Sequence, residues 1–229
     1  MLADLAFALM MAVARRVVEG DQFVRAGRWR TWTPKLMLGR DVWGATLGII
    51  GWGAIGQAVG HRAGGFGMRI LYVTRKGPDP AATNPVGAEC VDLARLLRES
   101  DFISIHVPLT ESTRHLIGAH ELAAMKSTAI IVNTARGPVI DQAALAAALQ
   151  TGRIAGAALD VTETEPIDPG DPLLKLSNVV ITPHIGSASF ATRLRMADLA
   201  VDNLLEVFAG RLPRRCANPE VKLRSPGAS

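Results

Sequence analysis

The chain has 229 residues, of which 48% are hydrophobic and 20% charged, with 22 glycines, 13 prolines and a net charge of +4. This composition is typical of a globular protein and excludes disordered, collagenous and coiled-coil chains. Two cysteines, Cys90 and Cys216, are too few for a disulfide framework, and no spacing resembles that of zinc ligands. We therefore expect a cytoplasmic protein that holds no metal.

The first expected element is a helix over Leu2–Glu19. Its apolar opening contains Asp4, lacks a preceding basic region and is too short to cross a membrane. An amphipathic helix therefore fits this segment better than a signal peptide or a membrane anchor. Four apolar residues fall at helical spacing along it: Leu5, Leu9, Ala12 and Val13.

A long connection, Gly20–Gly44, follows this helix and carries Trp29, Trp32 and Trp43. A loop of such length in a compact domain usually has a function, such as wrapping a partner. We therefore interpret residues 1–44 as a dimerisation helix with its connecting arm, and expect a symmetric homodimer.

Beyond residue 44, short apolar runs alternate with helical patterns. The runs are rich in Ile, Val and Ala with little polar alternation, which is typical of strands buried on both faces of a parallel sheet. The expected strands are Ala45–Gly51, Met68–Thr74, Asp101–Val107, Thr128–Ala135, Ala155–Val161 and Asn178–His184. The expected helices are Ala54–Ala63, Asp92–Glu99, Ala119–Met125 and Asp141–Gln150, the last with Asp141 as its N-cap. This alternation predicts an α/β fold with a doubly wound parallel sheet over residues 45–187.

A glycine-rich motif, Gly51-Trp52-Gly53-Ala54-Ile55-Gly56, follows the first of these strands and opens a helix. The first glycine allows a tight turn, the second lets the backbone approach a pyrophosphate, and the third lets helix and strand pack closely. The free N–H groups at the helix start favour phosphate. The motif in this context predicts a Rossmann-type NAD(P)-binding domain.

The end of the second expected strand indicates which nicotinamide cofactor binds. An NAD site usually has an acid about 20 residues after the glycine motif, to hold the ribose 2′-hydroxyl. Between Gln57 and Pro78 this chain has none, and Thr74 is followed by Arg75 and Lys76. Because cations bind a 2′-phosphate that a carboxylate would repel, we expect NADP, with NAD as the alternative.

Three polar segments end consecutive expected strands. Asn133–Asp141 contains Arg136, Leu159–Pro166 contains Glu165, and Thr182–Ser187 contains His184. Because carboxyl ends of parallel strands share one edge, these side chains are brought toward one crevice. A histidine can protonate a carbonyl oxygen near neutral pH, a carboxylate can orient it, and an arginine suits an α-carboxylate.

With these segments and the glycine motif, the sequence resembles the D-isomer-specific 2-hydroxyacid dehydrogenases over essentially its whole length. The wording Leu-Asp-Val-Thr and the Thr-Arg-Lys strand end are most similar to the glyoxylate/hydroxypyruvate reductase branch. The resemblance implies hydride transfer between NADP(H) and a small 2-keto acid with D-isomer specificity. It also implies that one of the arm's tryptophans, Trp29 or Trp32, reaches the partner subunit.

The resemblance also implies roles for single residues. Arg136 would hold the substrate carboxylate, His184 would be the acid and base, and Glu165 would orient it. Asp160 would meet the nicotinamide carboxamide. The expected cofactor-binding residues are Gly51, Gly53, Ala54, Ile55, Gly56, Thr74, Arg75, Lys76, His106, Val107, Pro108, Thr134, Ala135, Arg136, Asp160, His184 and Gly186.

Glu163 is a rival to Glu165 for the carboxylate role. The family pattern favours Glu165, because it places the acid immediately before the proline. Three other histidines, His61, His115 and His120, have no comparable neighbours in the sequence and are interpreted as surface or packing residues.

The last expected helix is Ser189–Gly210, so residues 188–229 form a C-terminal helix and tail. Much of the excess positive charge lies in this tail, at Arg211, Arg214, Arg215, Lys222 and Arg224. Aromatic residues make up only 5% of the chain and no basic helix interleaves with them, so nucleic-acid binding is not expected.

Members of the family begin with a substrate-binding domain of roughly a hundred residues, and this chain starts at the helix that follows it. The alternative function is a truncated nucleotide-binding or interaction module with little or no catalysis, similar to relatives in the superfamily that act as corepressors. A formate-dehydrogenase-like enzyme is disfavoured, because that branch has glutamine where Glu165 stands.

Overall fold

The computed structural model describes residues 1–75, 77, 86–213 and 216–221. Two compact units make up the chain: Leu2–Gly186, and a second unit of Met1 with the residues from Ser187 onward. Of the predicted dimerisation helix and arm, residues 1–44, all but Met1 are therefore part of the unit that holds the sheet.

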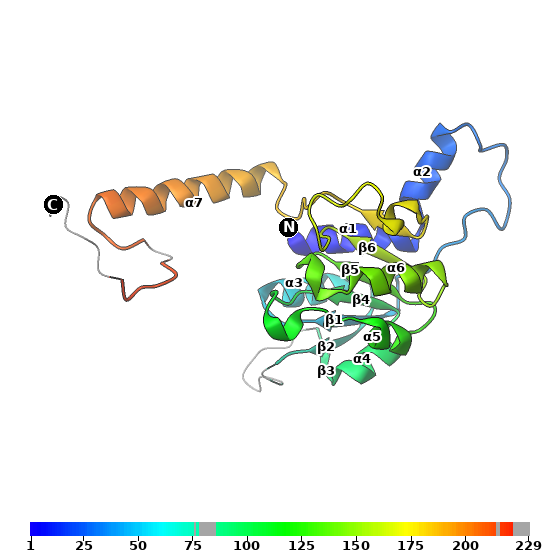
Figure 1. Ribbon diagram of the computed structural model, residues 1–229, viewed down its shortest axis with the longest axis horizontal. Helices are drawn as coiled ribbons and strands as arrows, with labels where there is room; N and C mark the ends of the chain where they lie inside the picture. The colour runs from blue at the N-terminus through cyan, green and yellow to red at the C-terminus, as the bar shows by residue number, and fades with distance from the viewer. Residues whose placement is uncertain (76, 78–85, 214–215, 222–229) are drawn as a thin grey trace. The chain divides into compact units, whose positions relative to one another are not determined.

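A seven-stranded sheet, all parallel, forms the centre of the larger unit (Figure 1). Its strand order is β3-β2-β1-β4-β5-β6-β7. This order confirms the predicted doubly wound fold, in which the chain moves outward from β1 and then returns to its other side. The strands are β1 (Thr46–Ile50), β2 (Arg69–Val73), β3 (Glu89–Cys90), β4 (Phe102–Ile105), β5 (Ile130–Asn133), β6 (Gly156–Leu159) and β7 (Val179–Ile181).

Helices cover both faces of this sheet, as the doubly wound topology requires. On the sheet, α1 (Leu2–Ala14) and α3 (Ala54–Gly65) lie on one face, and α4 (Leu93–Glu99), α5 (Ala119–Ala124) and α6 (Gln142–Gln150) lie on the other. The described residues also form α2 (Val17–Arg25) and, in the second unit, α7 (Phe190–Phe208). Three 3₁₀ turns are also present: η1 (Glu111–Thr113), η2 (Gly137–Val139) and η3 (Pro172–Lys175). The Asp141 side chain accepts a hydrogen bond from the amide of Ala144, so the predicted N-cap of α6 is confirmed.

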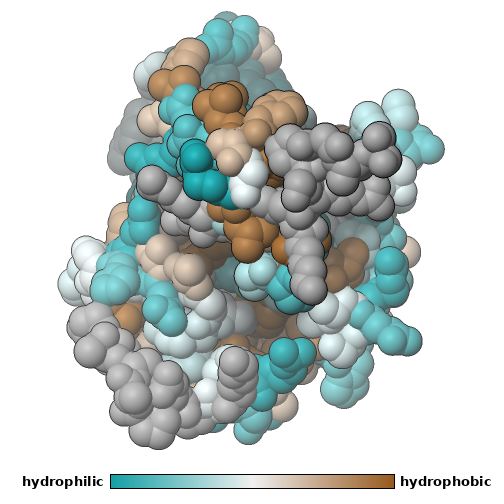
Figure 2. Space-filling model, turned by 90° about the vertical axis from the view of Figure 1, so that its left-hand side faces the viewer, coloured by the Kyte–Doolittle hydropathy of each residue, from teal (hydrophilic) through white to brown (hydrophobic). Residues whose placement is uncertain are grey.

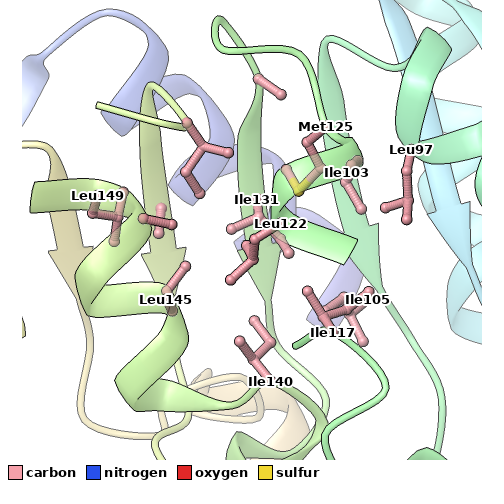
Figure 3. Close-up of a cluster of buried hydrophobic side chains, with 14 of the residues drawn as sticks. Leu97, Ile103, Ile105, Ile117, Leu122, Met125, Ile131, Ile140, Leu145 and Leu149 are labelled. Atoms are coloured by element: carbon pink, nitrogen blue, oxygen red, sulfur yellow. The ribbon is translucent and has the colours of Figure 1, made fainter. Parts of the chain in front are cut away.

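Alternate residues of each strand enter two separate hydrophobic clusters. In β5, Ile131 packs on the face of α4, α5 and α6, whereas Ile130 and Val132 pack on the face of α1 and α3. Figure 3 shows the first cluster, with Leu122 of α5 and Leu145 of α6 against the strands. Burial of both faces explains why the strands read as continuous apolar runs.

The predicted first helix, Leu2–Glu19, is wrong in one respect, because it is two helices. Arg16 has a left-handed φ of 52° between α1 and α2. The Ala14 carbonyl accepts a hydrogen bond of 2.7 Å from the amide of Arg40, a partner that the sequence pattern does not reveal. Helix α2 has no buried residue and projects away from the sheet (Figure 1).

Packing of α1 corrects part of the expectation for the dimer. Leu9 is 3% exposed and belongs to the cluster on its own sheet, against which Leu5 and Val13 also pack. Leu9 is therefore covered by its own chain and not available to a partner. The exposed apolar side chains of this region lie instead on α2 and the arm, and include Val17, Val24, Trp29, Trp32 and Trp43.

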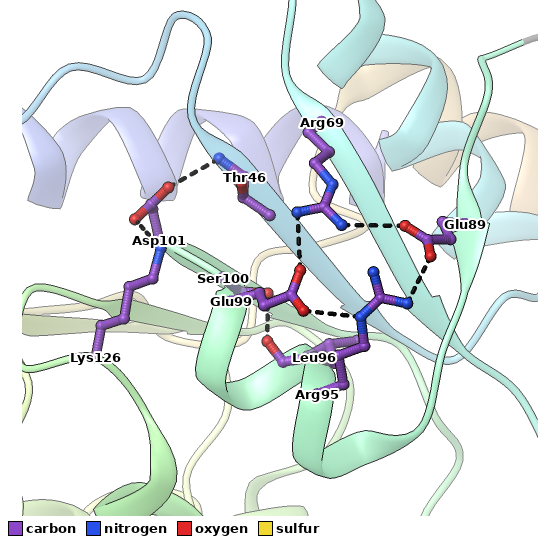
Figure 4. A network of polar contacts seen from close by, with 9 residues as sticks. All are labelled: Thr46, Arg69, Glu89, Arg95, Leu96, Glu99, Ser100, Asp101 and Lys126. Carbon is purple, nitrogen blue, oxygen red and sulfur yellow. Dashed lines mark hydrogen bonds and ion pairs between the residues drawn. The ribbon is translucent and has the colours of Figure 1, made fainter.

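An ion-pair network joins β2, β3 and α4 (Figure 4). Arg69 contacts Glu89 at 3.1 Å and Glu99 at 2.8 Å, and Arg95 contacts the same two carboxylates. Nearby, Asp101 accepts hydrogen bonds from the Thr46 amide and from Lys126. These contacts secure the sheet at its β3 edge and at the start of β1.

The second unit contains α7, none of whose residues is buried. Apolar side chains on it are exposed, among them Phe190, Leu194, Leu205 and Phe208. Figure 2 shows hydrophobic residues among hydrophilic ones on one face of the molecule. Within the part of the chain that the structure describes, no helix has both the length and the apolar character that a membrane span needs.

Candidate active site

Loops that carry the predicted motifs gather at the carboxyl edge of the sheet. The chain reverses its winding direction between β1 and β4, because β2 and β3 lie on one side of β1 and the later strands on the other. In open α/β sheets, ligands bind at such a switch point. The loops after β1 and β4 meet there, since the His106 amide donates a hydrogen bond of 2.7 Å to the Ile50 carbonyl.

Two of the three glycines of the motif after β1 have a steric reason. Gly51 has a φ of +100°, and a Cβ there would lie 2.6 Å from the carbonyl oxygen of His106. A Cβ on Gly56 would collide with the Gly51 carbonyl, so α3 could not start so close to β1. A Cβ on Gly53 would meet no atom within 4 Å, so this position faces open space.

The N-terminus of α3 is suited to an anion. Gly53 is the N-cap residue and supplies no side-chain hydrogen bond, and Ala54 and Ile55 are exposed. The first amides of a helix have no partner within the helix, so a phosphate group at this exposed N-terminus would find donors and the positive end of the helix dipole. The residues present fit a dinucleotide pyrophosphate.

The end of β2 lies beside this loop. The Gly51 amide donates to the Val73 carbonyl at 2.9 Å, so Thr74 and Arg75 follow directly from a residue bonded to the glycine motif. Thr74 is half-buried and Arg75 is exposed, with its side chain available to an anion. Lys76, the second predicted cation, lies outside the described residues.

The loop after β4 begins with His106, followed by Val107 and Pro108. The His106 ring nitrogen Nε2 lies 2.8 Å from the Ser104 hydroxyl. Burial lowers the pKa of His106 to about 4, so its ring is neutral near pH 7. A Cβ on Gly51 would also lie 2.9 Å from Val107, so this loop packs closely against the glycine motif.

The Arg136 turn after β5 is held by the Asn133 side chain. Asn133 accepts from the Ala135 amide and donates to the Arg136 carbonyl at 2.9 Å. The guanidinium of Arg136 is exposed, and its Nη1 donates to the Ala135 carbonyl. Thr134 is 6% exposed, and its hydroxyl oxygen is the one buried side-chain polar atom without a hydrogen-bond partner among the described residues. Such an unsatisfied group is consistent with a ligand at this turn.

His184 and Glu165 form a direct pair after β7 and β6. The Nδ1 atom of His184 lies 2.7 Å from Oε2 of Glu165, while Oε1 of Glu165 accepts from the Thr162 amide at 3.2 Å. His184 has a left-handed φ of 53° and a half-exposed side chain. The pair therefore has a fixed carboxylate and an imidazole open to solvent.

Asp160, expected to meet the nicotinamide carboxamide, is buried behind the loop after β7. It is 1% exposed, and its carboxylate accepts three hydrogen bonds from the loop after β7: from the Thr182 hydroxyl and from the amides of Ile185 and Gly186. Its carbonyl also accepts from the His184 amide at 2.9 Å. Asp160 thus braces the loop that carries His184, a function that the sequence pattern did not suggest.

The Arg136 turn and the Glu165 turn are in contact through Gly137. A Cβ on Gly137 would collide with the carbonyl oxygen and carbon of Thr162 and with the Glu163 amide. The two turns can therefore touch only because residue 137 lacks a side chain.

Sequence analysis missed a second histidine–carboxylate pair. His115 Nε2 lies 2.6 Å from Oε1 of Glu163, and the Glu163 amide donates to the Gln142 side chain at 2.9 Å. Gln142 in turn donates to Asp171. A cavity of about 420 Å³ is lined in part by Gln142, Glu163 and Asp171. Gln142 is thus hydrogen-bonded to both of the other two lining residues. His115 follows β4 and Glu163 follows β6, strands that β5 separates, so the sequence pattern gave no sign of this pair.

The chain is similar to known proteins along most of its length. Residues 7–186 match a model of the D-isomer specific 2-hydroxyacid dehydrogenase NAD binding domain. A glyoxylate reductase from Korarchaeum cryptofilum is 57% identical over 227 residues, which are 98% of this chain and 68% of that protein.

Solved structures give the same result. The TT0316 protein from Thermus thermophilus has a TM-score of 0.88 and 51% identity, covering 93% of this chain and 67% of that one. A glyoxylate reductase from Paecilomyes thermophila has a TM-score of 0.81 and 40% identity, covering 92% of this chain and 63% of that one.

Proposed function

This chain belongs to the D-isomer specific 2-hydroxyacid dehydrogenase family, and on that premise we propose that it transfers a hydride between NADP(H) and a small 2-keto or 2-hydroxy acid of the glyoxylate or hydroxypyruvate type. The observation that carries this proposal is the His184–Glu165 pair, at 2.7 Å, on the same sheet edge as the glycine motif. The resemblance to glyoxylate reductases supports the substrate class.

His184 is the proton donor in the proposed reduction. Its Nδ1 is directed at Glu165, which leaves Nε2 free to protonate the carbonyl oxygen of the substrate. Glu165 fixes the ring orientation and stabilises the imidazolium. In the reverse reaction the same nitrogen takes the hydroxyl proton, so His184 serves as acid in one direction and base in the other.

Arg136 binds the substrate carboxylate in this proposal. Its exposed guanidinium extends from a turn that the Asn133 side chain holds with two hydrogen bonds. A planar guanidinium can bind a carboxylate with two parallel hydrogen bonds. Binding at the α-carboxylate places the adjacent carbonyl between Arg136 and His184. The arginine therefore also polarises the carbonyl that accepts the proton.

The nicotinamide cofactor, when bound, supplies the hydride that reaches the carbonyl carbon. The glycine motif and the N-terminus of α3 hold its pyrophosphate, and the loop from His106 to Pro108 lines the adenine side. Arg75 holds a 2′-phosphate, since no carboxylate stands between Gln57 and Pro78 to bind a 2′-hydroxyl. We therefore favour NADPH over NADH.

The protein functions as a homodimer in this proposal. Helix α2 and the arm carry exposed apolar side chains, of which Trp32 is 75% exposed and Val24 51% exposed. Such a protruding apolar surface is suited to an isologous contact with a second copy. Light scattering at micromolar concentration checks this point, and a monomeric mass contradicts it.

The test of the function is the oxidation of NADPH upon addition of glyoxylate or hydroxypyruvate. We expect turnover that depends on both substrates and that His184→Ala abolishes while NADPH still binds. Tight NADPH binding with no turnover would instead favour a nucleotide-sensing interaction module. A chain that binds neither NADPH nor NADH contradicts both functions.

A further inference from the structure

Trp52 lies inside the glycine motif, and its side chain packs on the neighbouring strand. Its indole stacks on the ring of Tyr72, with centroids 4.4 Å apart and planes 19° from parallel. Tyr72 is in β2, 7% exposed and two residues before Thr74. The stack therefore connects the turn that would hold the pyrophosphate to the strand whose end carries Arg75.

Helix α3 confines the indole from another direction. A Cβ on Gly60 would lie 2.7 Å from Cη2 of Trp52 and 3.1 Å from Cζ3, so a side chain at residue 60 would displace the ring. Gly64, one turn further along α3, would make only ordinary contact, with its Cβ 3.7 Å from Val86. The indole thus occupies a slot between β2 and a glycine of the helix.

A backbone hydrogen bond acts beside this stack. The Gly51 amide donates to the Val73 carbonyl at 2.9 Å, so consecutive residues of the motif contact consecutive residues of β2. The hydrogen bond alone would let the glycine motif rotate relative to β2. Together with the stacked rings it fixes both the distance and the orientation of the motif relative to β2. A dinucleotide that contacts the motif and the strand end at once gains from that fixed geometry.

We propose that Trp52 and Tyr72 are positioning residues, which set the placement of the pyrophosphate turn relative to Arg75 and so favour a cofactor with a 2′-phosphate. This inference rests on the proposed NADP(H) function and adds two residues that contact neither reacting atom. A cofactor without the 2′-phosphate contacts the strand end less and depends less on the stack.

The experiment measures Kd for NADPH and NADH by calorimetry on the whole chain, without substrate. The variants are Trp52→Ala, Trp52→Phe and Gly60→Ala, with Gly64→Ala as the matched control. We expect Trp52→Ala and Gly60→Ala to weaken NADPH binding about 3- to 10-fold, the range for an aromatic pair, and NADH binding less. Trp52→Phe retains a stacking ring and should keep most of the wild-type affinity for NADPH.

Gly60→Ala keeps both aromatic residues and adds a helix-favouring side chain, so it gives a result even where Trp52→Ala does not fold. Unchanged NADPH affinity in these variants, or equal losses for both cofactors, overturns the inference while leaving the cofactor proposal intact. A wild-type chain that binds NADH as tightly as NADPH contradicts the cofactor proposal, and the inference with it.

Discussion

Glu163 and Glu165 are separated by one residue, yet their carboxylates bind two different histidines. Glu165 contacts His184 at 2.7 Å, while Glu163 contacts His115 at 2.6 Å. Both residues are glutamates of the same loop, and each contacts a histidine. Substituting each in turn therefore distinguishes an effect on the orientation of the His184 imidazole from an effect on the loop.

Glu165→Gln should lower kcat about 100-fold, the low end of the range for a proton-transferring group, because the amide cannot stabilise an imidazolium. Glu163→Gln is the matched control and should lower kcat less than about threefold, because its carboxylate contacts His115 and Gln142 and not the His184 imidazole. NADPH oxidation with glyoxylate, fitted for kcat and KM, measures both. Equal losses in the two variants would contradict the assignment of roles.

Arg75→Ala should weaken NADPH binding about 10- to 100-fold, since a charge-assisted contact contributes about 1.5–3 kcal/mol. NADH affinity should hardly change, because that cofactor has no 2′-phosphate. Arg98→Ala, which removes an exposed guanidinium from α4, controls for the loss of net charge. Parallel calorimetric titrations decide the matter, and a matching loss of NADH affinity would count against the 2′-phosphate site.

Gly137→Ala should lower both stability and turnover. The new methyl group would collide with the Thr162 backbone, so the Arg136 and Glu165 turns must separate, at about 1–3 kcal/mol by analogy with overpacked cores. A displacement of about 1 Å between these side chains can lower kcat roughly 100-fold. Gly65→Ala is the control, because a Cβ there meets no atom within 4 Å. Chemical denaturation and steady-state kinetics test the pair, and similar results for both would refute the contact.

Stability should fall with decreasing pH partly through His106. Burial lowers its pKa from 6.5 to about 4, so between these values the unfolded chain binds a proton that the folded chain does not. The contribution is complete above pH 6.5 and decreases by on the order of 3 kcal/mol toward pH 4. His106→Asn removes this titration and should flatten that part of the profile. Urea unfolding across the pH range measures the difference, and parallel profiles would speak against it.

The 229-residue chain should bind NADPH but reduce its substrate slowly. Arg136 is exposed and the His184 side chain is half-exposed, so water screens the charges that would stabilise the transition state. We expect kcat well below the typical enzyme value of about 10 per second. A rate at or above that value would show that this exposure does not limit catalysis.

The sequence predicts the sheet well because β1, β2, β4, β5 and β6 are largely buried, with β7 partly buried, so that these six strands appear as apolar runs. It misses β3, since two residues, Glu89 and Cys90, carry no periodic signal. It also misses the break at Arg16, which depends on a hydrogen bond from Arg40 to Ala14, far away along the chain.

The candidate site shows the same limit. Motif residues could be placed, because strand ends of a parallel sheet share an edge. Three contacts could not be predicted: the hydrogen bonds of the Asp160 carboxylate, the His115–Glu163 pair and the Trp52–Tyr72 stack. Each joins loops or strands whose spacing is determined only by the packed fold. The choice of Glu165 over Glu163 as the neighbour of His184, in contrast, followed from the family pattern, and the two side chains are in contact in the structure.

Both outer strands of the sheet are short, with two residues in β3 and three in β7. An outer strand exposes unpaired backbone groups that can template pairing with a foreign strand, and brevity and charge are the usual protections. Glu89 of β3 is already engaged by Arg69 and Arg95, so its side of the sheet presents paired charges where another chain would have to dock. We therefore expect this protein to self-associate through side-chain contacts and not through strand pairing. Concentrated solutions should resist forming the cross-β aggregates that long exposed edge strands favour.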